Sequence, residues 1–281
     1  MKKHMKSSVE MQFDNCVKNE LKRYIRYYWY TTGYIEDDTG QQLLPMDHSD
    51  LIIQFQGAFL YFINNEVFKP EMVLFQGFRT KPIEVVQNHY GEAFGISFEP
   101  WGIYAFTGVP MSQFMDRVVN LSEVNPGLTQ SLESIVESHR ELKAEKDLNA
   151  LKESIEILLM KERKVSKTYL DVISIFEAFC AEDSVIINNF CKNQGIQRRK
   201  LERDFKKYIG VSPKDFLRIR QFEASSRVIL KNGDERLTDI AVDFNYYDQA
   251  HFAKSFKEYT HHTPSEFKKE KPALKSKMEF K

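Results

Sequence analysis

Residues Thr238 to Phe267 read TDIAVDFNYYDQAHFAKSFKEYTHHTPSEF, and this stretch decides the fold of the C-terminal half of the chain. The pattern predicts two short helices joined by a tight turn, with Thr238 capping the first helix, Asn245 in the turn and Asp248 capping the second helix. The buried face of the second helix has spacings of four and three: Phe252, Phe256 and Tyr259. Its opposite face is polar and basic. This arrangement is typical of a helix-turn-helix, which places such a face in the major groove of DNA.

A second copy of the pattern lies upstream, from Ile186 to Phe216. Its apolar residues Leu201, Phe205 and Tyr208 each stand 51 positions before their counterparts (256 − 205 = 51). The offset continues through GVSPKDF and HHTPSEF, where a proline opens the following helix in each copy. Two copies are too few for a solenoid, so the repeat predicts one all-α domain with tandem helix-turn-helix units.

Charge divides the chain into two halves. Over 281 residues, 40 Lys and Arg balance 40 Asp and Glu. Residues 1–162 contain 16 basic and 23 acidic residues, a net of −7, whereas residues 163–281 contain 24 and 17, a net of +7. The basic half is the one with the helix pairs, so it meets the electrostatic requirement of a polyanionic partner such as double-stranded DNA.

The acidic half has a different pattern. Short β-type runs such as LIIQF, FLYFI and EMVLF extend from Tyr24 to about Phe98, separated by Gly, Pro and Asn, and helical periodicity begins after Pro100. The predicted fold class is α+β with two domains: an N-terminal antiparallel β sandwich or barrel with helical cover, and a C-terminal all-α tandem helix-turn-helix. The expected parts are a β-rich effector or sensing domain at 1–125, bridging helices at 126–162, a double helix-turn-helix domain at 163–272 and a basic tail at 273–281. Lys161 to Lys167 is expected to be a hinge between the halves.

Aromatic residues are concentrated in the acidic half, and apolar small-molecule sites are often lined by aromatic rings. The sequence therefore nominates a pocket for a small-molecule effector, lined by Tyr28, Trp29, Phe55, Phe59 and Trp101. Core packing is the alternative for each ring, because a sandwich core is also built from aromatic residues. The bridging helices have two interpretations as well, either cover within the domain or the seam of a homodimer.

Other classes of protein lack their motifs. His48 and His89 form no HxH or HExxH pairing, and no nucleophile elbow, Walker loop or dinucleotide fingerprint is present, so no enzyme activity, metal or cofactor is expected. Cys16, Cys180 and Cys191 have no CxxC spacing. No apolar run approaches membrane-spanning length and the opening MKKHMK is not followed by one, so the expectation is a cytoplasmic protein with no membrane partner.

Ser166 to Lys271 resembles the DNA-binding domain of the AraC/XylS family of bacterial transcription regulators. The resemblance is carried by RRKLERDFKKYIGVSPKDFLRIRQFEASSRVIL at Arg198–Leu230 and LTDIAVDFNYYDQAHFAKSFKEYTHHTPSEF at Leu237–Phe267. Residues 1–162 are more weakly similar to the effector-type domain of one branch of these regulators, through LPMDHSDLIIQFQG, LFQGFRTKPI and GISFEPWGIYAF. The resemblance implies that one monomer lays both recognition helices into successive major grooves, held by the long helix Pro213–Leu230.

The resemblance also implies which side chains face the DNA. The base-contacting positions correspond to Arg198, Arg199, Glu202, Arg203, Gln249, Ala250, Ala253 and Lys254. Arg pairs with guanine, Gln with adenine, Glu accepts from cytosine and an Ala methyl touches thymine, so these residue types suit the role. Phosphate contact or solubilising charge is expected for Lys206, Lys207, Arg218, Lys257 and Lys268. A solvated surface charge is the alternative for Arg199 and Lys254.

Three positions depart from the family pattern. Gln197 stands in place of a capping Ser, Asn245 in place of the turn Gly, and His261 in place of the Gly before the TP pair. Gln is a poor cap and His is strained at positive φ. We therefore expect the start of the first recognition helix and the turn at His261 to differ from the family pattern.

The sequence thus predicts a sequence-specific transcription regulator with a sensing or dimerising N-terminal domain. Its expected partners are double-stranded DNA, with a small-molecule effector, a second copy of the chain and RNA polymerase as candidates. The alternative is a protein-interaction or nonspecific nucleic-acid-binding architectural module. A salt titration separates the two, because nonspecific binding is electrostatic throughout.

Overall fold

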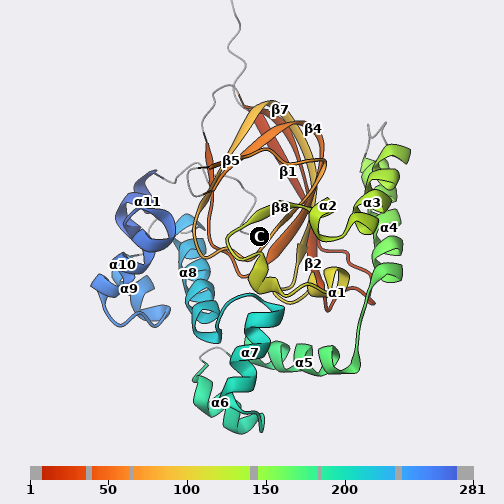
Figure 1. Cartoon of the computed structure of the whole chain (residues 1–281). Helices are drawn as coiled ribbons and strands as arrows, with labels where there is room; N and C mark the ends of the chain where they lie inside the picture. The colour runs from red at the N-terminus through yellow and green to blue at the C-terminus, as the bar shows by residue number, and fades with distance from the viewer. Residues whose placement is uncertain are drawn as a thin grey trace, which may run out of the picture.

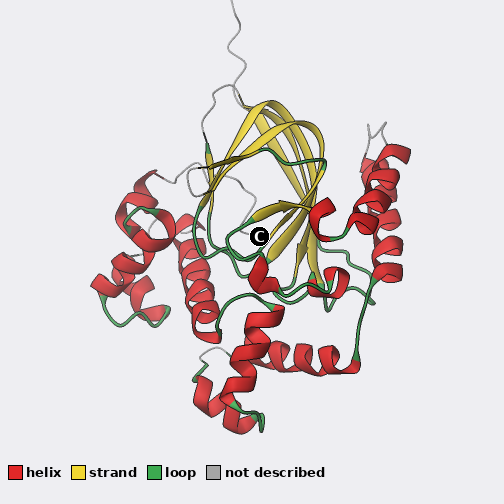
Figure 2. Cartoon of the chain, viewed as in Figure 1, coloured by secondary structure: helices red, strands yellow, loops and turns green. Residues whose placement is uncertain are grey.

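The structure is a computed structural model that describes residues 8–35, 40–63, 66–139, 145–182, 185–231 and 236–270. The basic tail expected at 273–281 lies outside these ranges. The described part contains a β-rich N-terminal region followed by helices, as the predicted α+β class requires (Figure 2).

The N-terminal region is a single curled antiparallel sheet with the strand order β1-β2-β7-β4-β6-β8 (Figure 1). β3 pairs with β7 and β5 pairs with β4, off this path. The strands are β1 Ser8–Asp14, β2 Ile25–Ile35, β3 Gln41–Leu43, β4 Ser49–Ile63, β5 Glu66–Phe68, β6 Val73–Gln76, β7 Ile83–Phe98 and β8 Val118–Asn120. The sequence prediction left sandwich and barrel open, and the continuous curled sheet corresponds to the barrel-like alternative.

The two longest strands organise the sheet. β7 pairs with β4 along one edge, and its other edge is shared by β2 and β3. The β4 register shifts between Gln54 and Gln56 and again between Gln56 and Ala58, and such bulges bend a strand and increase its twist. Before the bend, successive side chains of β4 alternate between the two faces of the sheet. Leu51 and Ile53 enter the main core, whereas Ile52 belongs to a smaller second cluster.

Helices cover one side of this sheet. They are α1 Tyr104–Thr107, the 3-10 helix η1 Met111–Gln113, α2 Leu121–Val124, α3 Pro126–Ser138 and α4 Glu145–Glu162. Three apolar residues of α4 are fully buried in the main core, namely Leu151, Ile155 and Leu159, whereas Ile157 is exposed. The Tyr28 hydroxyl donates a 3.0 Å hydrogen bond to buried Glu156 of α4, which fixes the helix against β2. Such contacts are expected of a helix that covers the sheet of its own domain.

The C-terminal region is all α-helical. It comprises α5 Lys167–Ala181, α6 Ile187–Asn193, α7 Arg198–Tyr208, α8 Pro213–Lys231, α9 Leu237–Asp243, α10 Gln249–Thr260 and α11 Pro264–Glu270. The α6–α7 pair and the α9–α10 pair lie at opposite ends of the long helix α8 (Figure 1). Among the described helices, none combines the length and apolar composition that crossing a bilayer would need.

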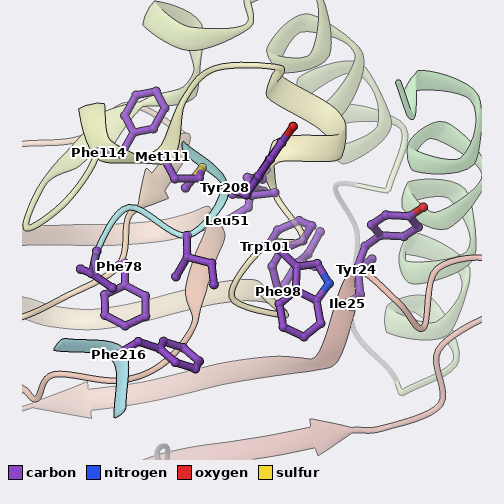
Figure 3. Packing of buried hydrophobic residues seen from close by; sticks show 14 of the residues in the cluster. Tyr24, Ile25, Leu51, Phe78, Phe98, Trp101, Met111, Phe114, Tyr208 and Phe216 are labelled. Atoms are coloured by element: carbon purple, nitrogen blue, oxygen red, sulfur yellow. The ribbon is translucent and has the colours of Figure 1, made fainter. Parts of the chain in front are cut away.

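The two regions share one hydrophobic core. Tyr208 of α7 meets Tyr104 of α1 with ring centroids 4.7 Å apart, and Phe78 lies 6.0 Å from Phe216 of α8 (Figure 3). Trp101 stacks on Phe176 of α5 at 5.7 Å. Aromatic pairs at these distances stabilise the packing beyond what burial of the rings alone contributes. The helix-turn-helix domain is therefore packed against the N-terminal region in this structure.

The segment expected to be a hinge, Lys161–Lys167, contacts the N-terminal region. The Lys164 backbone N–H donates a 2.7 Å hydrogen bond to the Ala105 carbonyl oxygen, and the Arg163 guanidinium lies over the Tyr24 ring. Arg163 also donates a 2.5 Å hydrogen bond to the Glu20 carbonyl oxygen. A charged, polar stretch resembles a linker in sequence. Here the Arg163 guanidinium contacts a carbonyl oxygen and an aromatic ring that lie about 140 positions earlier in the chain, which no local pattern shows.

Candidate DNA-binding surface

The first helix-turn-helix forms where the repeat predicts it. Gly195 has φ 63°, a left-handed geometry that glycine adopts without steric cost, and α7 starts three residues later. Gln197 occupies the N-cap position of α7 but makes no side-chain capping bond. The predicted departure from a capped start is therefore confirmed. Leu201, Phe205 and Tyr208 are buried, and Phe205 packs edge-on against Phe176 at 4.9 Å.

The outward face of α7 presents the predicted base-contacting side chains. Arg199, Glu202 and Arg203 are all exposed, Arg203 by 73%. Arg198 is exposed too, but its guanidinium is bonded to Glu202 at 2.9 Å and to Asn188 of α6 at 3.1 Å. Arg198 therefore holds α7 against α6, whereas the neighbouring Arg199 is exposed.

The second helix-turn-helix repeats this geometry with different local chemistry. Asn245 takes the left-handed turn position at φ 56°, and the Asp248 side chain caps α10 by accepting from the His251 backbone N–H at 2.7 Å. Both features were predicted. The predicted cap at Thr238 is wrong, because α9 begins at Leu237 and its N-cap residue, Arg236, makes no side-chain bond. His261 has φ 63°, which is the strained turn that the sequence indicated.

The outward face of α10 also carries its predicted residues. Gln249, Ala250 and Lys254 are exposed and Ala253 is partly exposed. The sequence analysis missed Tyr247, whose side chain is 92% exposed in the turn directly before α10. A fully exposed aromatic ring is unusual on a soluble surface, and the Tyr246–Tyr247 doublet hid it because Tyr246 is buried. Tyr247 therefore joins the candidate surface.

The predicted phosphate-contacting cations divide into two groups. Lys206, Arg218 and Lys257 are exposed, and Lys268 of α11 is partly exposed. Lys207 is different, because its ammonium lies over the Tyr208 ring at 4.8 Å and the Tyr104 ring at 5.5 Å. Lys207 thus covers the junction between the two domains, a position decided by α1 that no local pattern could predict.

A cleft of about 830 Å³ runs between the two helix-turn-helix units, with α8 as its floor. Its cations come from α7 and from the floor helix α8, and the second unit contributes Asp243: the cations are Arg198, Lys214, Arg218 and Arg220. Gln221 of α8 donates a 2.6 Å hydrogen bond to the Phe244 carbonyl oxygen and so ties α8 to the second turn. The cations on α7 and α8 give this part of the cleft a charge that suits a phosphate backbone.

The N-terminal region contains a separate cavity inside the curled sheet. Of the predicted pocket residues, Trp29 and Phe59 line it, together with polar residues that include His48, Asp50, Gln54, Gln76 and Arg79. The other three predicted rings do not line this cavity. Tyr28 is buried against α4, Phe55 packs on the main core, and Trp101 donates to the Arg23 carbonyl oxygen and stacks on α5. Strand and helix partners decide on which side of a sheet a ring lies, and composition does not show them.

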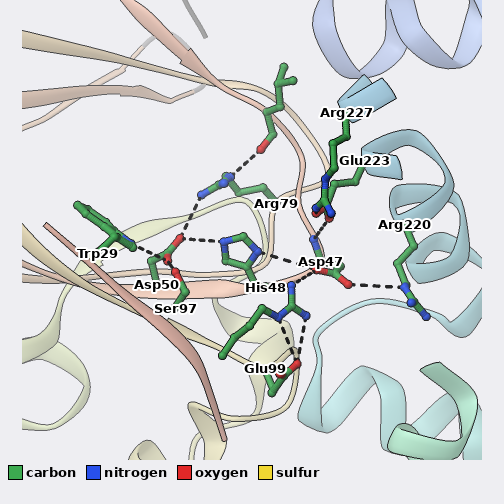
Figure 4. Close-up of polar contacts among 12 residues, drawn as sticks. Trp29, Asp47, His48, Asp50, Arg79, Ser97, Glu99, Arg220, Glu223 and Arg227 are labelled. Atoms are coloured by element: carbon green, nitrogen blue, oxygen red, sulfur yellow. Dashed lines mark hydrogen bonds and ion pairs between the residues drawn. The ribbon is translucent and has the colours of Figure 1, made fainter. Parts of the chain in front are cut away.

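A network of ionic contacts leads from this cavity to α8 (Figure 4). His48 lies 3.6 Å from Asp50 in the cavity and 3.9 Å from Asp47. Asp47 accepts a 2.7 Å hydrogen bond from Arg26 and lies 3.6 Å from Arg220 of α8. Its backbone N–H donates to Glu223 of α8 at 3.3 Å.

The pKa values of the two carboxylates at this junction, Asp47 and Glu223, shift in opposite directions. Burial disfavours ionisation of Asp47, but the Arg26 guanidinium outweighs burial and holds the pKa of Asp47 well below its usual range. Burial raises the pKa of Glu223, and the nearby Asp47 carboxylate raises it further. In the cavity, burial raises the pKa of Tyr61, and the Asp50 carboxylate raises it further. Within the described residues no group of three or more His, Cys, Asp or Glu is arranged to hold a metal ion.

Comparison with known families gives two matches. Residues 190–270 match the family model of a helix-turn-helix domain, and residues 18–120 match a domain of unknown function. An uncharacterised HTH-type transcriptional regulator of Staphylococcus aureus is 32% identical over 80 residues, which is 28% of this chain and 11% of that protein. The HTH-type transcriptional regulator MtrA of Neisseria gonorrhoeae is 27% identical over 89 residues, 32% of this chain and 29% of that protein.

Among solved structures, apo ToxT K231A of Vibrio cholerae aligns over 86% of this chain and 96% of its own, with a TM-score of 0.46 and 12% identity. This chain spans 11% of the length of the Staphylococcus regulator that it matches. The helix-turn-helix family model matches residues 190–270. What the comparisons identify is therefore a helix-turn-helix domain at residues 190–270, similar in sequence to that of HTH-type transcriptional regulators.

Proposed function

We propose that this protein is a sequence-specific DNA-binding transcription regulator whose N-terminal domain modulates the DNA-binding domain. The observation that carries the proposal is the pair of helices α7 and α10, each burying an aromatic face and exposing a polar one. A helix with that division of faces, second in a helix-turn-helix, has the geometry that enters a major groove. Reading genomic DNA would place the activity in the cytoplasm.

Base recognition is assigned to the side chains that protrude from these helices. Arg199 is the foremost candidate in α7, because Arg198 and Glu202 are paired with each other. In α10, Gln249 and Lys254 are exposed and suit adenine and guanine respectively. Contact with the DNA phosphates is assigned to cations of the C-terminal domain, of which three are exposed and Lys268 is partly exposed: Lys206, Arg218, Lys257 and Lys268.

The route from the N-terminal domain to the DNA is assigned to α8. This helix connects both helix-turn-helix units, and its buried face is held by Asp47 and Phe78 of the N-terminal domain. A ligand that alters the cavity around His48 and Asp50 would act on α8 through Asp47. Within the described part of α4, Leu151, Ile155 and Leu159 pack inside the chain and Ile157 is exposed. A second copy of the chain and RNA polymerase are candidate partners.

The test is selection of DNA sites by the full chain from random fragments, followed by Arg199→Ala and Lys206→Ala. Loss of Arg199 should remove discrimination at one base position, worth about 1 to 3 kcal/mol. Loss of Lys206 should weaken all sites alike and reduce the slope of log affinity against log salt by about 1. The proposal fails if wild-type protein binds all fragments equally after competition.

A second function, nonspecific binding of nucleic acid, is favoured by the net charge of +7 in residues 163–281. A salt titration distinguishes the two functions. A specific complex should keep an advantage of about 10³ or more over random DNA, whereas a nonspecific complex would lose its affinity for every fragment together.

A further inference from the structure

The cavity inside the curled sheet is built by strand alternation. Asp50, Ile52 and Gln54 follow one another at every second position of β4 and all line the cavity. Gln76 of β6 is the direct partner of Asp50 across the sheet and lines it as well. Neighbouring strands therefore bring three polar side chains to one wall. The same wall carries the apolar side chain of Ile52.

Two hydrogen-bond donors on this wall have no partner. The side-chain amide nitrogens of Gln54 and Gln76 are buried and make no hydrogen bond, and Gln76 is only 1% exposed. A buried donor without an acceptor destabilises the folded protein. A third glutamine in the same cavity shows the contrast, since the Gln87 amide donates a 2.8 Å hydrogen bond to the Gly33 carbonyl oxygen. The unpaired amides therefore point to an acceptor that the cavity receives.

The charges in the cavity are already compensated. Asp50 accepts from Ser97 at 2.5 Å and from the Trp29 indole at 3.4 Å, and it lies 3.8 Å from the Arg79 guanidinium. Arg79 is 1% exposed and donates to the Leu44 carbonyl oxygen at 2.9 Å. An ionic ligand would bring an uncompensated charge into this buried site, which is costly. An uncharged ligand brings no such cost.

The size and walls of the cavity narrow the ligand further. The space open to the centres of water-sized molecules is about 80 Å³. A cavity needs roughly 10 to 15 Å³ on this measure to hold one water, so this one has room for several. The Trp29 and Phe59 rings also line the cavity and supply apolar surface. This is room for a small ring or short branched skeleton, not for a long acyl chain.

We propose that this cavity binds a small uncharged molecule whose oxygen atoms accept hydrogen bonds from Gln54 and Gln76. Its carbon skeleton lies against the aromatic rings of Trp29 and Phe59. This names the chemical class of the effector. That the bound molecule regulates DNA binding rests on the proposed function. Binding itself depends only on the N-terminal domain.

The experiment uses three probes of similar shape with the full-length protein. Tetrahydropyran-4-one is uncharged and carries two acceptor oxygens, tetrahydropyran-4-carboxylate is the anionic match, and the 4-ammonium compound is the cationic match. Trp29 fluorescence reports occupancy, with Trp29→Phe as the control because Trp101 is the other tryptophan. The uncharged probe should bind with a Kd of about 1 mM, a value suited to so few atoms, and the charged probes at least tenfold more weakly, about the effect of one unpaired buried group.

Glutamine variants then test the contacts. Gln76→Leu should weaken the uncharged probe about tenfold and leave the melting temperature of the free protein unchanged or higher, because it removes an unsatisfied donor. Gln87→Leu, the matched change in the same cavity, should lower the melting temperature because the Gly33 carbonyl loses its donor. Gln54→Leu repeats the first test at the other amide.

Three results would overturn the inference. They are tighter binding of either charged probe, no change in Trp29 fluorescence with any probe, or Gln76→Leu and Gln54→Leu variants that lose stability yet bind the uncharged probe as well as wild type does. Failure of the proposed function has a separate signature. In that case the uncharged probe would bind as expected, while the wild-type chain would show no preference among DNA fragments.

Discussion

Replacing Asp47 by Asn should destabilise the protein by breaking the junction between its two domains. Asp47 is buried, accepts a 2.7 Å hydrogen bond from Arg26 and lies 3.6 Å from Arg220 of α8. Asn has the same shape but no charge, so the change leaves the packing and removes the ion pairs. Arg26 is then left partly buried with a single carboxylate, Glu99, at 3.1 Å.

The magnitude follows from burial. Removing one partner of a buried ion pair costs about 3 to 5 kcal/mol, because the other charge is left without its counterion. Since Arg26 keeps Glu99, the lower end applies, and we expect a loss of about 3 kcal/mol in the free energy of unfolding. Glu202→Gln is the matched control. It makes the same chemical change in the exposed pair with Arg198, where a loss of about 0 to 1 kcal/mol is expected.

The assay is urea unfolding of the full chain at neutral pH, repeated at lower pH. The folded-state pKa of Asp47 is depressed, so its stabilisation is present above its unfolded value, about 4, and is lost as the pH falls through the folded-state pKa. The difference between wild type and Asp47→Asn should therefore shrink in acid. An Asp47→Asn cost no larger than that of Glu202→Gln, or a difference that grows in acid, would refute the reasoning.

Three further predictions concern stability. Phe205→Ala should cost about 3 to 5 kcal/mol in denaturant unfolding, because its fully buried ring packs on Phe176 and Phe179; a loss under about 1 kcal/mol would contradict this. His261→Gly should raise stability by about 0.5 to 1 kcal/mol, since left-handed backbone strains His more than Gly; a lower melting temperature would count against it. The raised pKa of Glu223 means that its contribution is present at acid pH and lost as pH rises through that pKa, so Glu223→Gln should flatten this decline in a pH series.

The sequence determined most of the helical C-terminal half of this protein. Helix pairs are specified by residues three, four and seven positions apart, and those residues meet within one element whatever the rest of the chain does. The repeat placed Leu201, Phe205 and Tyr208 in the core, and the structure confirms each one. The cap at Asp248 and the left-handed turn at Asn245 are equally local and were also predicted.

Only the tertiary structure decided what lies between the domains and inside the sheet. Asp47 and Glu223 are 176 positions apart in the chain, and nothing in the pattern around either residue indicates the other. The cavity is formed by alternate residues of β4, β6 and β7, so its lining depends on strand order and register. Contacts across strands and domains are fixed by how the whole chain packs, whereas a helix carries its own period in its sequence. For this reason the recognition helices could be found from the residues alone, and the cavity at Gln54 and Gln76 could not.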